Sequence, residues 1–539
     1  MAPERVTSVR GSVIAACVML SACVFEETYV PGPPPTPVPD LVEDRHVYDQ
    51  DGLEVLTVRL TVTDLEALAA VQDDVPDASA PVLFQEGSYG AGLDVPNGTI
   101  QLRGSSSRSS DLHSYKVKLS GAGWRGLTKL NLLKHPYDLT RLRNRLSFEY
   151  MRSIPNFTSL RLQFVHLFLN GEDLGLYENI ENPGKAFLDA HGLVRGELYK
   201  ANNFAFYPLT AAQLADPKLR EDILESKGVD ADPTKLDQLL RDINDPTLDT
   251  DRMFATHFNV DNYVTWLAIN VLFGNSDTSN QNFMIYSPPD TEGWYFLPWD
   301  FDGAWGFNGP DGQPGTTVRA RTRVGLATWW LVPLHQRFLR DPKNVALLDA
   351  KMDELMGSVL GDDTTRAMLA RYHDVVRPYI TQAPDVDHLP DNHSPTRAAS
   401  VAAWETEVDR IGGHLRRARD EYDAVRGRPM PIYLADPEPG AQPGTLVFRW
   451  DASFQLAGQR LTYDLEVSRT PMFGAGDLVV AESGMTSTTL TAPALSAGQY
   501  YWRVVTRAGD APDNWQDCAE TYYDASRTKF PGVRALTIP

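Results

Sequence analysis

The chain has 539 residues, of which 22% are charged, and its formal net charge is −21 at pH 7. This length is sufficient for more than one hydrophobic core, and the acidic balance argues against a general nucleic-acid-binding protein, which requires a basic face. Zinc proteases and serine hydrolases are without support as well, because the sequence contains no HExxH, CxxC or Gly-x-Ser-x-Gly pattern.

The first predicted element is a lipoprotein signal peptide over residues 1–22. Arg5 and Arg10 precede the apolar run SVIAACVMLSAC, which is too short to span a bilayer. The run ends in Leu-Ser-Ala-Cys, which resembles the bacterial lipobox and implies cleavage before Cys23 and lipidation of its thiol. An ordinary secretory signal with an incidental cysteine is the alternative.

Lipidation would place the protein in the bacterial cell envelope. No other stretch is apolar enough to span a membrane, so we expect membrane contact through a lipid anchor only. Val24 rather than Asp follows the cysteine, which favours the outer membrane, on its periplasmic or its surface face. With Cys17 removed and Cys23 lipidated, Cys518 has no partner for an intrachain disulfide. The proline-rich residues 23–44 are predicted to form an extended tether.

Strands and one short helix follow the tether. The alternating pattern predicts a strand over residues 53–63, and a short helix is expected over 64–71. Two more strands are predicted over 98–104 and 114–120, joined by a serine-rich loop. The second of them places two lysines on one face, which either meets a phosphate chain or forms a solvent-facing edge.

Residues 101–152 reverse the charge of the chain. They carry eleven lysines and arginines against three acids, which gives a local net charge of +8. A basic region in an acidic protein indicates an anion site, and a solvated basic face is the alternative.

The middle of the chain is predicted to contain two helices and a hairpin. A helix over residues 138–153 would have Asp138 or Thr140 as its N-cap. Two strands over 160–181 would be joined at the turn signal Asn-Gly-Glu-Asp, and residues 252–273 are expected to be helical.

Acid and amide side chains then stand beside aromatic residues, in GNSDTSNQNFMIY and LPWDFDGAWGF. Polar groups among apolar neighbours indicate a cleft with a metal site, a proton-transfer site or a calcium loop. A kinase catalytic loop also places an Asn five residues after its Asp, as in Asp277 and Asn282, and a later strand ends in a metal-binding Asp, as at Asp300. The residues after 300–303 lack the ligand ladder of a calcium loop. A glycosidase using Asp277 and Asp300 would leave the Asn spacing and the basic region without a role.

Several segments together resemble the spore-coat CotH family, whose members are atypical kinases with a protein-kinase-like fold. The resemblance covers residues 45 to 425, and the last two segments are its most specific part. The segments are LRGSSSRSSDLHSYKVKL, LNLLKHPYDLTRLRNRLSFEYM, LFLNGEDLGLYENIEN, NVLFGNSDTSNQNFMIY and WYFLPWDFDGAWGF.

The resemblance implies an α+β fold over residues 45–427 and a set of catalytic and metal-binding residues. Asp277 would orient or deprotonate the acceptor hydroxyl. Asn282 and Asp300 would bind Mg²⁺, with Mn²⁺ as an alternative ion. Asp302 would bind a second ion or simply cap the segment after the strand.

The same resemblance implies an ATP site in the basic region. Lys118 would meet the nucleotide phosphates, with Lys116 as the competing lysine. Glu181 would set the lysine or the adenine edge, or would be a surface acid. A glycine-rich phosphate loop is absent, so the serines at 105–110 would supply hydroxyl and backbone N–H donors in its place. The lid or phosphate contacts would be Arg103, Ser106 and Arg108.

A second domain is predicted over residues 428–539, after the Pro/Gly-rich boundary at 428–444. Its short strands are separated by turns and carry their apolar residues on one face, as at Tyr500, Trp502 and Val504. The pattern resembles an all-β immunoglobulin- or fibronectin type III-like sandwich, which would bind a protein or a glycan.

The sequence therefore predicts a surface-anchored CotH-like kinase that transfers the γ-phosphate of ATP to Ser or Thr hydroxyls of a protein, with the chain itself as an alternative acceptor. A nucleic-acid polymer is not expected as a partner. The alternatives are a catalytically inactive nucleotide-binding protein and an adhesin or structural lipoprotein on the same fold. An adhesin would keep its function when Asp277 is replaced.

Overall fold

A computed structural model describes most of the chain after the predicted leader. Cys23, Ser106 and the signal peptide over residues 1–22 lie outside the described residues, so these three predictions stay as they are. The described residues are 35–88, 95–104, 108, 110–228, 233–307, 321–389 and 397–539.

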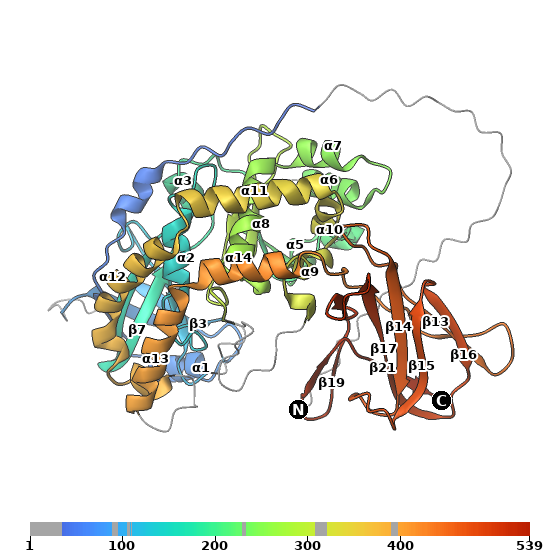
Figure 1. Ribbon diagram of the computed structural model, residues 1–539. Coiled ribbons are helices and arrows are strands. Elements are labelled where there is room, and N and C mark those ends of the chain that lie inside the picture. Colours follow the sequence, from blue (N-terminus) through green and yellow to red (C-terminus); the bar gives the residue numbers. More distant parts are fainter. Residues whose placement is uncertain are drawn as a thin grey trace. The chain divides into compact units, whose positions relative to one another are not determined.

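The first part of the chain folds into a closed β-barrel (Figure 1). All neighbouring strands are antiparallel except β1 and β6, which pair in parallel. Alternate side chains such as Val58, Ile100 and Val117 point inward and are fully buried, as the period-two pattern of half-buried strands requires. In order around the barrel the strands are β1 (Leu56–Thr61), β2 (Ala80–Glu86), β3 (Gly98–Arg103), β4 (Ser114–Leu119), β5 (Lys129–Leu133), β7 (Glu172–Ile180) and β6 (Leu162–Leu169).

Two helices are inserted between the barrel strands, α1 (Leu65–Gln72) and α2 (Arg143–Met151). Helix α2 begins later than predicted, with Leu142 at its N-cap position. Neither predicted cap residue stands there, but the Asp138 carboxylate still accepts hydrogen bonds from the backbone N–H groups of Thr140 and Arg143, at 2.9 and 3.2 Å. The acid therefore organises the turn before the helix.

A second sheet follows the barrel, with its strands in the order β11, β10, β8, β9 and all neighbours antiparallel. Helices α8, α11 and α14 pack together beside it and share a large core with it (Figure 1). The strands are β8 (Glu197–Ala201), β9 (Leu224–Ser226), β10 (Phe283–Ser287) and β11 (Tyr295–Pro298). The helices are α3 (Lys185–Ala190), α4 (Ala211–Ala215), α5 (Pro217–Arg220), α6 (Thr234–Asn244), α7 (Thr250–His257), α8 (Val260–Leu272), α9 (Ala327–Trp330), α10 (Pro333–Leu339), α11 (Pro342–Ser358), α12 (Asp362–Ile380), α13 (Arg397–Ile411) and α14 (His414–Val425).

The helical stretch expected over 252–273 is confirmed except for a break, because the structure has two helices there, α7 and α8. The break lies at Phe258 and Asn259, whose backbones are extended. The Asn259 side chain accepts the N–H of Asn262 at 2.9 Å and so caps α8. An Asn at this position satisfies an N–H that the helix cannot satisfy itself, which makes a new helix start favourable.

The last part of the chain is all β. Two sheets share one core, in which Phe448 of the first sheet contacts Trp502 of the second with ring centroids 5.1 Å apart. Helix and sheet together confirm the α+β class, while the kinase-like fold and the fibronectin-like type stay predictions. The first sheet is β12 (Glu438–Pro439), β13 (Thr445–Arg449) and β16 (Thr489–Pro493); the second is β15 (Leu478–Met485), β14 (Leu461–Ser468), β17 (Gly498–Ala508), β18 (Trp515–Gln516) and β21 (Arg534–Ile538); β19 (Thr521–Tyr523) pairs with β20 (Lys529–Pro531).

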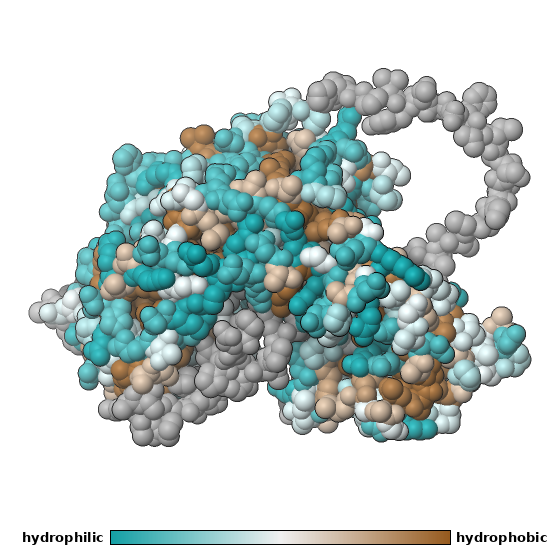
Figure 2. Space-filling model, in the orientation of Figure 1, coloured by the Kyte–Doolittle hydropathy of each residue, from teal (hydrophilic) through white to brown (hydrophobic). Residues whose placement is uncertain are grey.

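The surface of the described residues is mostly hydrophilic on one face. The face drawn in Figure 2 is mainly hydrophilic, with apolar patches between the hydrophilic regions. Within the described ranges, no helix combines the length and the apolar character needed to cross a membrane.

Candidate active site

One cavity of about 650 Å³ brings together five of the predicted site residues, with Arg103 on the barrel side. Asp277 and Asn282 line it from the segment before β10, and Asp300 and Asp302 line it from the segment after β11. Because β10 and β11 are paired antiparallel neighbours, the start of one strand lies beside the end of the other. The sheet thus assembles two motifs that are separated in sequence.

Asp277 and Asn282 contact each other directly. Asp277 lies in a short 3₁₀ turn (Ser276–Thr278) after α8, and Asn282 has a left-handed backbone with φ = 56° just before β10. Asn282 Nδ2 donates to Asp277 Oδ2 at 2.8 Å, and Gln281 Nε2 donates to Oδ1 at 2.8 Å. Asp277 faces the solvent of the cavity but has protein on most sides, and this desolvation, together with the charge of Asp302, raises its pKa.

Asp300 and Asp302 form the acidic end of the cavity. Asp300 also has a left-handed backbone, with φ = 55°, in the turn that follows β11. Burial raises the pKa of Asp300 above its ordinary value, and the neighbouring Asp302 charge raises it further. A cation bound between these two carboxylates would offset their mutual repulsion and stabilise both in the ionised form.

These donors fit Mg²⁺. Two carboxylates and an amide oxygen are the hard oxygen ligands that this ion prefers. Across the part of the chain that the structure describes, no group of three or more His, Cys, Asp and Glu side chains forms a metal cage. Mg²⁺ is commonly held by one or two protein carboxylates plus substrate phosphates. A site with these few protein ligands is therefore sufficient when the substrate supplies the remaining ones.

Two buried residues that the sequence did not suggest hold the acidic segment in place. His135 Nδ1 lies 3.2 Å from Asp302 Oδ2, and its Nε2 lies 3.0 Å from Glu178 Oε2. Burial by itself lowers the pKa of His135, but the hydrogen bonds to Asp302 and Glu178 raise it well above its ordinary value. Asn144 Oδ1 accepts the N–H of Phe301 at 2.7 Å. The contacts of His135 with Asp302 and of Asn144 with Phe301 bridge more than 150 positions, and no local signal marks them.

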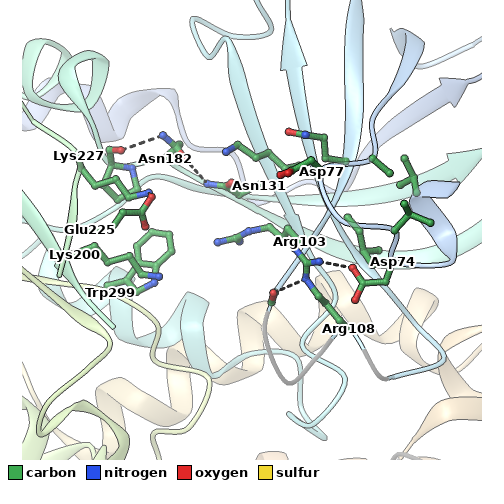
Figure 3. Close-up of a pocket in the computed structure, with 18 residues that line it drawn as sticks. Asp74, Asp77, Arg103, Arg108, Asn131, Asn182, Lys200, Glu225, Lys227 and Trp299 are labelled. Atoms are coloured by element: carbon green, nitrogen blue, oxygen red, sulfur yellow. Dashed lines mark hydrogen bonds and ion pairs between the residues drawn. The ribbon is translucent and has the colours of Figure 1, made fainter. Parts of the chain in front are cut away.

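A second cavity of about 370 Å³ adjoins the first (Figure 3). Both cavities are lined by Arg103, Gly104, Lys200 and Trp299, which therefore form their junction. Five cationic side chains line the second cavity against three acids, which makes it the positive neighbour of an acidic site. The cations are Arg103, Arg108, Lys116, Lys200 and Lys227, and the acids are Asp74, Asp77 and Glu225.

Of the two competing lysines, Lys116 lines this second cavity, and Lys118 is exposed and lines neither. Both point to the same face of β4, but Lys116 pairs across from Gln101 and Asn131, whereas Lys118 pairs across from Thr99 and Lys129. Lys118 is thus two residues, about 7 Å, farther from the Arg103 end of the sheet. Burial lowers the pKa of Lys116, and nearby cations, first Lys118, lower it further.

The predicted lid residues that the structure describes also face the second cavity. Arg108 forms an ion pair with Asp74, and its Nε donates to the Gly104 carbonyl at 2.8 Å. Arg103, at the end of β3, lies 5.8 Å from the Trp299 ring centre, and its Nη1 is buried without a hydrogen-bond partner among the described residues. Burial lowers the pKa of Arg103.

Glu181 is a correction, because it lines neither cavity. Its side chain is only 1% exposed, which also excludes the surface-acid alternative. The carboxylate accepts from Arg161 Nε at 2.9 Å and from His191 Nε2 at 2.8 Å. Burial by itself raises its pKa, but the hydrogen bonds and charges of His191 and Arg161 lower it overall. Glu181 therefore belongs to a closed ionic cluster in the protein interior.

Comparison with known proteins agrees with this geometry. A family model described as "CotH kinase protein" matches residues 100–422, which is more than half of the chain. The chain belongs to the CotH kinase protein family. The match runs from within β3 into α14 and includes every residue that lines the first cavity, whereas residues 71–78 of the second cavity lie before it.

A curated relative points the same way. "Inner spore coat protein H" of Bacillus subtilis (strain 168) is 26% identical over 212 residues, which are 38% of this chain and 58% of that protein. The aligned part therefore spans less than two thirds of the relative's length. Among the predicted site residues, only Cys23 lies outside the range of the CotH family match.

Proposed function

We propose that this CotH-family protein transfers the γ-phosphate of ATP to a Ser or Thr hydroxyl of a protein, including its own chain as an alternative acceptor. One observation carries the proposal. An acidic cavity with the Asp277–Asn282 pair and the Asp300–Asp302 pair opens directly onto a cationic cavity. Phosphoryl transfer needs both, because the phosphate charge must be neutralised while a carboxylate faces the acceptor hydroxyl.

The phosphate chain is proposed to cross the junction of the two cavities. Lys116 and Arg103 would contact it from the barrel side, while Asn282 and Asp300 would hold Mg²⁺, with Asp302 as a further ligand. Bound Mg²⁺ supplies positive charge against the phosphate oxygens and holds them in line for transfer. The chain itself supplies the fixed cations and the walls that orient the nucleotide.

Asp277 is proposed to act on the acceptor. Each of its carboxylate oxygens already accepts one hydrogen bond, from Gln281 or from Asn282. A carboxylate oxygen has a second lone pair, so either oxygen can still accept the proton of a Ser or Thr hydroxyl. The two amide contacts fix the carboxylate in one orientation, which reduces the reorganisation needed during transfer.

The place of action is a separate proposal. A lipid on Cys23 would anchor the protein in the cell envelope, where surface proteins would be its acceptors. The C-terminal sheets would then be available to bind a protein or a glycan.

The test uses the purified full chain with γ-labelled ATP, Mg²⁺ and a generic acidic acceptor protein. We expect label transfer by the wild type, loss of transfer in Asp277→Asn, and full transfer in Asp290→Asn, a control at an exposed loop position. Transfer that persists in Asp277→Asn would contradict the proposed role. Magnesium-dependent stabilisation by ATP without any transfer would instead support a nucleotide-binding protein that has lost catalysis.

A further inference from the structure

Lys200 occupies the junction of the two cavities, and neither the sequence motifs nor the comparisons give it a role. It lies on β8, directly across from Met284 of β10. The next residue, Ala201, accepts the backbone N–H of Asn282 at 3.2 Å, so β8 also fixes the start of the Asn282 strand. Lys200 lines both cavities, whereas Lys116 and Lys227 line only the cationic one.

Lys200 and Arg103 approach the same aromatic ring from different elements. Lys200 Nζ is 5.6 Å from the Trp299 ring centre, and the Arg103 guanidinium is 5.8 Å from it. Figure 3 shows Lys200 and Trp299 on one wall and Arg103 reaching toward them from the barrel side. Trp299 itself is buried, at 4% exposure. The indole therefore holds two cations in place beside a shared space.

Neither cation has its charge satisfied by a hydrogen-bonded acid. Arg103 Nη1 is buried and unpartnered, and no described residue accepts a hydrogen bond from Lys200 Nζ. Glu225, the acid on the same wall, is ion-paired with Lys227. Burial lowers the pKa of Lys200, and the charges of Glu225 and Asp300 oppose this shift. Two half-buried cations with free donors in one cavity favour an anionic ligand.

We propose that Lys200 is a phosphate-binding residue that contacts the β- and γ-phosphates of the bound nucleotide; this inference rests on the proposed kinase function. Its position between the Asp300 end and the Lys116 end of the joined cavities matches the terminal phosphates better than the nucleoside. A lysine suits this place because its three donors on a flexible stem can follow a phosphoryl group as it moves.

The role of Lys200 in transfer follows from the charge balance of the reaction. The bond between the γ-phosphorus and the β–γ bridging oxygen breaks, and a bond from the γ-phosphorus to the acceptor oxygen forms. The acceptor proton passes to Asp277, and negative charge develops on the departing ADP. Lys200 stays protonated throughout and stabilises that charge.

A purely structural role is the competing explanation, in which Lys200 only supports Trp299. Binding of nucleotides that differ in phosphate number distinguishes the two explanations. A phosphate contact affects ATP and ADP but leaves AMP unchanged, whereas a distorted cavity weakens all three alike.

The experiment measures calorimetric binding of ATP, ADP and AMP in Mg²⁺ to the full chain, for the wild type, Lys200→Met, Lys200→Arg and the exposed-lysine control Lys129→Met. We expect Lys200→Met to weaken ATP about tenfold or more and AMP less than twofold, by loss of a charge-assisted hydrogen bond. Lys200→Arg should recover part of the ATP affinity, because it keeps the charge, and Lys129→Met should match the wild type. Transfer by Lys200→Met should show a lower kcat as well as a higher KM for ATP.

Two results would overturn the inference while the proposed function stands. The first is unchanged ATP affinity in Lys200→Met, and the second is an equal loss for ATP and AMP together with a lower melting temperature in both Lys200 variants. Wild-type protein that binds no ATP would overturn the proposed function and this inference together.

Discussion

Two groups of charged side chains, around Glu181 and at the cavity junction, differ in how their charges are satisfied. In the cluster around Glu181, the carboxylate contacts Arg161 and His191, and His191 in turn lies 2.6 Å from Glu43. Each charged side chain there has an opposite charge within hydrogen-bonding distance, although Glu43 Oε2 has no hydrogen-bond partner among the described residues. At the cavity junction, Arg103 has an unpartnered nitrogen, and Asp300 lies beside a like charge.

The charges around Glu181 stabilise the fold through partners within the protein, whereas the charges at the cavity junction are arranged to bind a ligand. A closed cluster contributes its electrostatic energy to the folded state, and removing one member leaves another buried and unpaired. An open arrangement destabilises the folded protein until an ion or anion completes it, which is typical of functional sites. Glu181 is buried and Asp300 is half-buried, and both are acids of predicted site motifs, but only Asp300 has this open character.

The largest expected effect is on catalysis at the open site. Asp300→Asn should lower label transfer at least about 10³-fold, or about 4 kcal/mol, because the metal-binding charge is lost. Asn also tolerates the left-handed backbone of this position. The free energy of unfolding should stay the same or rise, since a like charge has been removed. Label transfer and urea unfolding of the same preparations check this, and a matching loss of stability would contradict it.

A substitution in the closed cluster around Glu181 should have the opposite effect, lowering stability while leaving phosphate transfer unchanged. Glu181→Gln should lower the free energy of unfolding by about 3 kcal/mol, because it leaves Arg161 and His191 without their buried partner charge. The folded fraction should transfer phosphate at the wild-type rate. Denaturant unfolding measures the first effect. The control is Glu172→Gln, at an exposed position at the start of β7, the strand that Glu181 follows; it should change stability by less than about 0.5 kcal/mol. Equal stability of Glu181→Gln and Glu172→Gln would contradict the distinction between the closed cluster and the open site.

The pH dependence of the free energy of unfolding should reflect the protonation of His191 in the same cluster. Burial alone lowers the pKa of His191, but hydrogen bonds to Glu181 and Glu43 raise it to about 9 from an ordinary value of 6.5. A group whose pKa is raised in the folded state stabilises it fully below pH 6.5 and loses that contribution as the pH rises through 9. The shift corresponds to about 3 kcal/mol.

His191→Gln should therefore have a lower free energy of unfolding than the wild type at pH 6. The difference between the two proteins should become steadily smaller up to pH 9.5. Unfolding curves across this range give the difference directly. A stability difference between His191→Gln and the wild type that is independent of pH would mean that His191 is not charged in the folded protein.

The smallest expected effect distinguishes the two lysines of β4. Lys116→Met should weaken ATP binding about tenfold, or about 1.4 kcal/mol, because Lys116 faces the cationic cavity. Lys118→Met should change it less than twofold, since this side chain is exposed to solvent. Parallel titrations of the two variants decide the assignment, and the reverse order would restore Lys118 as the phosphate contact.

The local pattern of the sequence was sufficient to predict many elements. Strands β3 and β4 follow from alternation, and the β6–β7 hairpin follows from alternation with an Asn-Gly turn at Asn170. The Asp277–Asn282 contact is also local, because five residues in a tight turn can close on themselves. The break at Asn259 was missed, because apolar periodicity continues through it and an Asn inside such a run gives little sign that it caps a new helix.

Sequence alone thus determined the family, the mixed α and β composition and the identity of the acidic motif residues, all of which depend on neighbours in the chain. Only the tertiary structure decided which charges are open to a ligand. Glu178 rather than Glu181 supports the acidic segment, Lys116 rather than Lys118 lines a cavity, and Lys200 joins both cavities. The physical reason is that a buried charge is satisfied by partners that packing brings from distant positions, as with His135 and Asp302, which are 167 residues apart.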